Sequence, residues 1–105
     1  MRIKDVTSDF ILFDNKTYIT SEHYRDCCEI NYADFEQIEQ SAFDVEFDEN
    51  LVFEEVETQG FRFGSINTPM FFVPCYADQN GYYSSDVEIY YDSKQVLNVN
   101  CEMRD

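Results

Sequence analysis

Basic residues are scarce in this sequence, and their scarcity argues against one large class of function. The 105-residue chain has seven Lys and Arg against twenty-two Asp and Glu, which gives a formal charge of −15 at pH 7. A surface of this sign repels the phosphates of nucleic acids and of anionic lipids. We therefore expect no direct binding of nucleic acid or of a membrane.

Long apolar runs are missing as well. No segment has the length of a signal peptide or of a membrane span, so we expect a cytoplasmic protein. In that compartment the four cysteines stay reduced, and no disulfide framework is expected. Their positions contain no C-x-x-C pair, which is the strongest sequence signal for a zinc site or for thioredoxin-like chemistry. We expect the protein to have no cofactor.

Tryptophan is absent, and the chain has only three glycines and two prolines. No Gly/Ser/Pro-rich linker, low-complexity tract or repeat divides it, so we expect a single domain over residues 1–105. Aromatic residues are abundant, at 17% of the chain, and consist of ten Phe and eight Tyr. Disordered chains lack such residues, so we expect a folded domain with a core of phenylalanine and tyrosine.

Alternation of apolar and polar residues dominates the chain, which is typical of half-buried strands. The stretches expected to be strands are DFILFD, TYIT, CCEINY, FRFGSI, MFFVPCYA, YYSSDVEIYY, QVLNVNCEM and two short acidic strands on either side of 48–50. The expected turns are Asn15-Lys16, Asn80-Gly81 and 92–94. Pro74, inside its strand, indicates a sheet edge or a bulge.

One stretch, ADFEQIEQSAF over residues 33–43, has the spacing of a helix. Asp34 can cap it with Gln37 three residues later, and Phe35, Ile38 and Ala42 share a face. Sequential strands with short connections imply an antiparallel meander. We therefore expect an α+β, β-rich fold, with a single antiparallel sheet, curled or forming half a barrel, and one short helix.

The stretch SEHYRDCCEINYADF contains the only histidine, His23, close to two adjacent cysteines. His23 and Cys27 would lie on the same face of a strand, or one helical turn apart, so the imidazole could lower the pKa of the thiol and activate it as a nucleophile. Asp26 could orient the ring only if the backbone bends. No Gly-rich oxyanion turn adjoins the pair, so a structural role for His23 is the preferred interpretation.

Zinc is the other chemistry open to this stretch. His23 with Cys27 or Cys28 could bind the metal together with Cys75 and Cys101. Cys75 and Cys101, however, lie on apolar stripes of their strands, as small buried hydrophobic residues do. An enzyme or a zinc-binding protein centred on His23 and Cys27 or Cys28 is therefore the alternative hypothesis on function.

Two motifs together resemble a known family. H-x-x-D-C-C-E, at residues 23–29, and N-G-Y-Y-S-x-x-V, at residues 80–87, are similar to motifs of small phage and bacterial proteins with a domain of unknown function. The resemblance runs from about Ile11 to Val99. It implies no activity, cofactor or substrate, but it implies that the two motifs belong to one framework. Arg25 stands where the family has Gln, which argues against a catalytic amide there.

Acidic residues gather in a central segment, 26–60, that has no Lys or Arg. The simplest interpretation is a solvated face, and the functional one is a surface for a basic partner. Our leading hypothesis is a small, non-catalytic binding or regulatory protein that engages a basic protein surface, with a phage or mobile element as its candidate origin. One version is a nucleic-acid mimic, with carboxylates spaced like phosphates at about 7 Å. The residues expected at the partner surface are Glu36, Glu39, Asp44, Glu46, Asp48, Glu49, Glu54, Glu55 and Glu57.

A third hypothesis is binding of carbohydrate or peptide by aromatic side chains. Tyr82, Tyr83, Tyr90 and Tyr91 flank or form one of the expected strands. Two of the four should face solvent if the sheet alternates, although an exposed tyrosine needs no ligand. An oligomer could form through an exposed edge strand, and the sequence does not fix its state.

Overall fold

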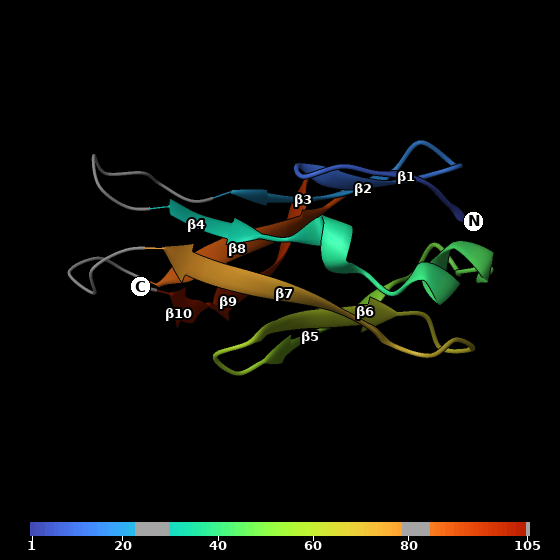
Figure 1. The fold of residues 1–105 in the computed structure, drawn as a ribbon. Helices are drawn as coiled ribbons and strands as arrows, with labels where there is room; N and C mark the ends of the chain where they lie inside the picture. Colours follow the sequence, from blue (N-terminus) through green and yellow to red (C-terminus); the bar gives the residue numbers. More distant parts are fainter. Residues whose placement is uncertain (23–29, 79–84, 105) are drawn as a thin grey trace.

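The computed structural model describes residues 1–22, 30–78 and 85–104, and in these residues it is an all-β protein (Figure 1). Two five-stranded sheets are present. The first contains, in spatial order, β1 (Ile3–Val6), β2 (Phe10–Phe13), β3 (Tyr18–Glu22), β8 (Asp86–Tyr91) and β9 (Lys94–Asn100). The second contains β10 (Glu102–Arg104), β7 (Phe71–Asp78), β6 (Gly60–Gly64) and β5 (Val52–Val56), with β4 (Ile30–Ala33) also paired to β7.

The expected single curled sheet is wrong, because the chain changes sheets three times. After β3 it crosses to the second sheet and forms β4 to β7, and it then returns as β8, which pairs antiparallel with β3. After β9 it crosses again, and β10 pairs parallel with β7. Side chains from both sheets form one buried cluster, so the sheets pack against each other and neither closes on itself.

The expected helix over residues 33–43 is also wrong. Its place is taken by two 3₁₀ turns, η1 (Phe35–Gln37) and η2 (Gln40–Asp44). Ile38 and Glu39 between them are extended, with ψ angles of 142° and 134°. Short helices gain most of their stability from burying one face, and here the two turns bury the same apolar residues without a continuous helix. No helix in the described ranges has the length and apolarity that crossing a membrane requires.

Two of the expected turns lie in the described residues, and both join neighbouring strands. Asp92 and Ser93, with φ of 51° and 67°, form a turn between β8 and β9 at the expected place. It is one residue shorter than expected, because Lys94 already belongs to β9. The turn between β2 and β3 is longer than expected, because Phe13 N–H bonds the carbonyl of Thr17. The positive φ, 72°, falls on Lys16 rather than on Asn15. The Asn80-Gly81 turn lies outside the described residues.

The first of the two acidic strands expected around residues 48–50 does not form. Phe43 and Asp44 belong to η2, and Phe47 lies in a loop with its side chain in the core. The amide of Phe47 donates to the carbonyl of Met1 at 2.7 Å, and the amino group of Met1 donates to the carbonyl of Phe47 at 2.7 Å. These bonds hold the loop beside β1 without adding a strand.

Pro74 lies inside the second sheet rather than at its edge. Its carbonyl accepts a hydrogen bond of 2.8 Å from the amide of Asp34, where β4 ends. If the ladder between β4 and β7 continued, the Asp34 carbonyl would accept a hydrogen bond from the amide of residue 74. Residue 74 is proline, which has no N–H. That carbonyl accepts instead from the amide of Gln37 in η1, at 3.2 Å. The proline therefore marks the end of β4, and the ladder leaves no acceptor unpaired there.

Phenylalanine fills the core, as the composition predicted, but none of the tyrosines in the described ranges is fully buried. The rings of Phe13, Phe47 and Phe63 lie 5.7–6.4 Å apart in edge-on and tilted pairs. Phe13 comes from the first sheet, Phe63 from the second, and Phe47 from the loop that follows η2. The loop thus closes one end of the space between the sheets.

Candidate functional site

The histidine–cysteine candidates cannot be placed in the fold. His23, Asp26, Cys27 and Cys28 lie outside the described residues, so the catalytic and zinc hypotheses stay predictions. Within the described ranges, no group of three or more His, Cys, Asp or Glu is arranged to hold a metal ion.

Cys75 and Cys101 are buried in the core as free thiols, which confirms that they are packing residues. The two thiols are neighbours, and the thiol of Cys101 donates to the carbonyl of Val99 at 3.9 Å. The contact with Cys101, together with burial, raises the pKa of the Cys75 thiol far above its ordinary value of 9.0. A thiol held neutral and out of solvent is a poor nucleophile and a poor metal ligand.

All the carboxylates expected at the partner surface are exposed. Apolar residues of the same segment, such as Phe35, Ala42 and Phe47, point into the core, so the segment is attached by one side and presents its acids on the other. The acids come from η1, η2, the loop before β5, β5 itself and the turn that follows it. We call this set the acidic surface: Glu36, Glu39, Asp44, Glu46, Asp48, Glu49, Glu54, Glu55 and Glu57.

Four of these carboxylates are engaged within the protein. Glu46 lies 2.6 Å from the amino group of Met1, and Glu54 pairs with Arg62. Glu55 accepts a 2.7 Å hydrogen bond from the amide of Asn100, and Asp48 accepts a 2.8 Å hydrogen bond from the amide of Asn50. Glu55 and six others have no ion pair with any Lys or Arg in the described ranges; the six are Glu36, Glu39, Asp44, Asp48, Glu49 and Glu57. The acidic surface therefore carries a large uncompensated negative charge.

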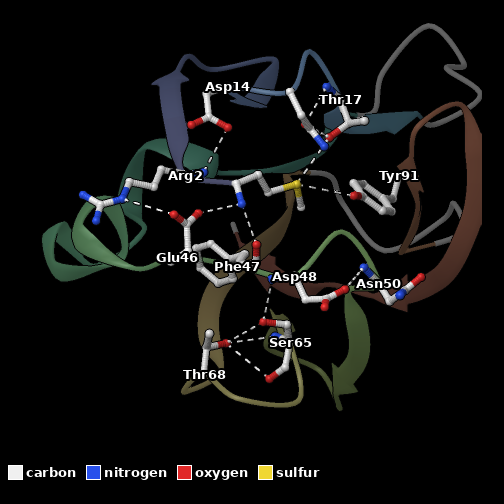
Figure 2. A network of polar contacts seen from close by, with 12 residues as sticks. Arg2, Asp14, Thr17, Glu46, Phe47, Asp48, Asn50, Ser65, Thr68 and Tyr91 are labelled. Carbon is white, nitrogen blue, oxygen red and sulfur yellow. Dashed lines mark hydrogen bonds and ion pairs between the residues drawn. The ribbon is translucent and has the colours of Figure 1, made fainter.

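Hydrogen bonds fix the loop that carries Glu46, Asp48 and Glu49 (Figure 2). The amide of Asp48 donates to the hydroxyl of Ser65 at 3.1 Å, and the amide of Ser65 donates to the hydroxyl of Thr68 at 2.9 Å. The carbonyl of Glu49 accepts a 2.8 Å bond from the hydroxyl of Tyr91. The bonds to Ser65 and Tyr91 use the backbone of the loop and leave the side chains of Asp48 and Glu49 exposed.

Glu46, Asp48 and Glu49, with Asp14 and Asn15 from the turn after β2, line an open pocket of about 590 Å³. The amino group of Met1 lies at this pocket, and the guanidinium of Arg2 lies 3.9 Å from Glu46. A fixed, anionic concavity of this kind suits a cationic group from another molecule.

The tyrosines of the third hypothesis have structural contacts where they are described. Tyr91 is half-buried against Phe13 and Phe53, at ring distances of 6.4 and 5.7 Å. Burial raises the pKa of its hydroxyl. Tyr90 is also half-buried, and Tyr82 and Tyr83 lie outside the described residues. The tyrosines of β8 therefore give no support to the hypothesis of a ligand-binding tyrosine face.

Sequence reasoning missed a groove beside β7. It has a volume of about 590 Å³, and its lining includes Gln59, Phe72, Pro74, Tyr76, Glu102 and Met103. These residues come from the turn before β6, from β7 and from β10. The alternation of β7 indicates which of its residues face outward, but no local signal shows that β10 lies next to it.

Comparison with protein families gives one match. The model of a domain of unknown function, DUF7448, matches residues 1–89, which span β1 to β7 and the first part of β8. The comparisons with curated proteins and with solved structures found no match. The match starts and ends earlier than the resemblance drawn from the two motifs, and it does not test their roles or a phage origin. Because it covers most of the sequence, the chain belongs to the DUF7448 family.

Proposed function

We propose that this protein is a small, non-catalytic binding or regulatory protein that engages a basic protein surface through its acidic surface. The observation that carries the proposal is the exposure of every carboxylate in that set, six of which form neither an ion pair with a described cation nor the contact to Asn100 that Glu55 makes. Burying the acids or pairing them with cations within the chain would have argued against it. Neither is seen for those six.

The energetics favour recognition by charge. Exposed carboxylates keep their water until a partner arrives, and a positive surface gains rate and specificity from the opposite potential. The hydrogen bonds around Asp48 and Glu49 fix the loop before binding, which reduces the entropy lost when a partner orders it. Charged contacts at such a surface weaken as salt shortens the Debye length, which is about 8 Å at physiological ionic strength.

Two variants of equal net charge test the proposal. The acidic-surface variant carries five amide substitutions at exposed acids without ion pairs: E36Q, E39Q, D44N, E49Q and E57Q. The control variant carries five at exposed acids elsewhere: D5N, D9N, E22Q, D78N and D92N. The two variants have the same net charge, so a difference in their affinities must come from where the removed carboxylates lie.

A capped peptide of alternating Lys and Arg serves as the probe, and calorimetry measures its affinity. We expect the acidic-surface variant to lose about tenfold in affinity, or 1.4 kcal/mol, and the control variant to lose much less. Equal losses in the two variants would mean that the peptide senses only net charge. That result, or no binding by the native protein, would contradict the proposal.

We also propose a cytoplasmic location and a phage or mobile-element origin. The support is the sequence alone, through its lack of a long apolar run and through the two motifs at residues 23–29 and 80–87. The identity of the neighbouring genes tests the origin. A locus with no phage or mobile-element genes would count against it.

A further inference from the structure

A small pocket lies where the two 3₁₀ turns meet the edge of the first sheet. It has a volume of about 180 Å³ and is lined by Val6, Glu36, Ile38, Gln40 and Phe43. We call it the Val6 pocket. Val6 ends β1, the edge strand of the first sheet, and the other four residues belong to η1, to η2 and to the link between them. Small-molecule sites have roughly 300–1,000 Å³, so this pocket has room for a single side chain.

The walls of the pocket are apolar. Val6 and Phe43 are half-buried and pack against the core, and Ile38 is buried. Gln40 and Phe43 are three positions apart in a 3₁₀ turn, where such residues project from the same side. The three apolar side chains therefore offer a surface against which a chain of methylene groups can pack.

Backbone hydrogen bonds fix the segment that forms these walls. The amide of Ile38 donates to the carbonyl of Phe35 at 3.2 Å, and the amide of Ala42 donates to the carbonyl of Glu39 at 3.0 Å. Phe35 and Ala42 are fully buried, so each turn is anchored in the core. The pocket is therefore formed before any ligand arrives, which reduces the entropy lost on binding.

One carboxylate, that of Glu36, stands at the pocket. Its side chain is exposed and forms no ion pair with the Lys and Arg side chains that the structure describes. Gln40 is also exposed and adds a carbonyl oxygen that can accept a hydrogen bond. Glu39 and Asp44 adjoin lining residues in the sequence, so further negative charge lies close to the pocket.

We propose that the Val6 pocket receives a lysine side chain of the basic partner. This inference rests on the proposed function, because that partner supplies the cation. The four-carbon stem of lysine packs on Val6, Ile38 and Phe43, and its ammonium donates to Glu36 and to the amide oxygen of Gln40. The stem thus leaves water while the charged end stays at the surface.

Charge and shape together favour lysine over other occupants. An anionic side chain would be repelled by Glu36 and by the net charge of −15. An aliphatic side chain would cover the walls but would leave Glu36 without a cation. Arginine has a shorter hydrocarbon stem and a planar head that gains most from paired hydrogen bonds or from stacking. Lysine therefore covers more of the apolar wall and still reaches the carboxylate.

The test is an NMR titration of the full chain with the capped peptide Gly₃-Lys-Gly₃ and three analogues. Norleucine in place of Lys keeps an aliphatic chain without the ammonium, and diaminopropionic acid keeps an ammonium on a much shorter stem. We expect the signals of the pocket residues to shift together with the Lys peptide. The affinity should fall about threefold with norleucine and about fivefold with diaminopropionic acid.

The third analogue has Arg in place of Lys and decides between the two cationic side chains. We expect it to bind less tightly than the Lys peptide. Tighter binding of the Arg peptide would overturn the assignment of the pocket to lysine. So would equal affinities for the Lys and norleucine peptides, because the carboxylate would then contribute nothing.

Glu36→Gln and Glu39→Gln form a matched pair. Each removes one charge from an exposed glutamate of the same segment, but only Glu36 lines the pocket. We expect E36Q to weaken the Lys peptide about threefold and to remove its advantage over norleucine. E39Q should weaken the Lys peptide by less than about 1.5-fold and keep that advantage, because a separated exposed charge is largely screened. Equal effects of the two substitutions would overturn the pocket.

Val6→Thr tests the apolar wall, because it replaces a methyl group with a hydroxyl. It should weaken the Lys and norleucine peptides by a similar factor, about twofold, and leave the diaminopropionic acid peptide unchanged. Val52→Thr makes the same change at an exposed position of β5 and should alter the affinity for none of them. Unchanged affinity for the Lys peptide in V6T would mean that the stem does not use this wall, and would overturn the proposal.

The failure of the pocket and the failure of the proposed function are distinguishable, because the acidic surface can be tested with Glu36 in place. The variant for this purpose carries E39Q, D44N, E49Q and E57Q, and its control carries D9N, E22Q, D78N and D92N. If these two bind the Lys/Arg peptide differently while E36Q and E39Q bind the Lys peptide equally, the pocket is wrong and the proposed function stands. If the four-substitution variants bind equally while E36Q and E39Q differ, the acidic surface is wrong and the pocket stands as a lysine site. Absence of both differences rejects both.

Discussion

Cys101 lies one position before Glu102, the residue that pairs with Tyr76, and this brings its thiol against that of Cys75 in β7. The contact falls where the chain leaves the first sheet and enters the second. The two thiols therefore pack at the junction between the sheets. The rate at which these thiols react with a reagent in solution shows whether solvent reaches the junction.

The first prediction concerns the reactivity of these thiols. In a variant with Cys27→Ser and Cys28→Ser, only Cys75 and Cys101 remain, and both are buried. We expect alkylation by iodoacetamide at pH 8 to be at least about a hundredfold slower than that of a free thiol, because it requires opening of the structure. Labelling in urea supplies the full-rate control. Rapid labelling of the native protein would mean that the junction is open.

The second prediction concerns stability at alkaline pH. Hydrogen bonding to Cys101 and burial raise the pKa of Cys75 above its ordinary value of 9.0, so the folded state keeps this proton while the unfolded state loses it. The stabilisation is fully present below about pH 9 and decreases as the pH rises further. Urea unfolding from pH 7 to 10.5 measures it. Cys75→Ala should make the decrease shallower, and an unchanged slope would contradict the assignment.

The third prediction concerns the core. Phe63 is fully buried, and its ring lies 5.7 Å from that of Phe47. We expect Phe63→Ala to lower the free energy of unfolding by about 3–5 kcal/mol, because it removes buried area and leaves a cavity. Phe72→Ala makes the same chemical change at a half-exposed site and should cost far less. Similar costs at the two positions would place the core elsewhere.

The fourth prediction concerns the turn between β8 and β9. Ser93 has a φ of 67°, a conformation that glycine adopts without the steric cost borne by a side chain. We expect Ser93→Gly to stabilise the protein by about 0.5 kcal/mol. Ser41→Gly is the matched control, since Ser41 lies in η2 with an ordinary φ, and there the change should destabilise. Destabilisation by both substitutions would contradict the turn geometry.

The strands and their buried faces could be predicted because their signals are local. Alternation in β7 correctly separates Val73, in the core, from Phe72, on the outside. The turn at Asp92-Ser93 depends only on residues that adjoin it. The expected helix was wrong because the spacing of Phe35, Ile38 and Ala42 suits one helix or two separate turns equally well.

The partition into two sheets could not be predicted, because it depends on contacts distant in sequence. The pairing of β3 with β8, and the break at Cys101 that sends β10 to the second sheet, have no local signal. The acidic surface follows from charge, since carboxylates stay in water unless they are paired. The groove beside β7 does not, because β6 and β10 adjoin the same strand only through pairings between segments distant in sequence.

The most direct test of the acidic surface is the salt dependence of binding. Affinity for the Lys/Arg peptide is measured for the native protein and for both five-substitution variants. The salt concentration is raised from about 25 to about 400 mM, which shortens the Debye length several-fold. We predict a steep loss of affinity with salt for the native protein and the control variant, and a much shallower loss for the acidic-surface variant. An affinity that does not change with salt concentration would contradict the account. So would the same dependence of affinity on salt in the two variants.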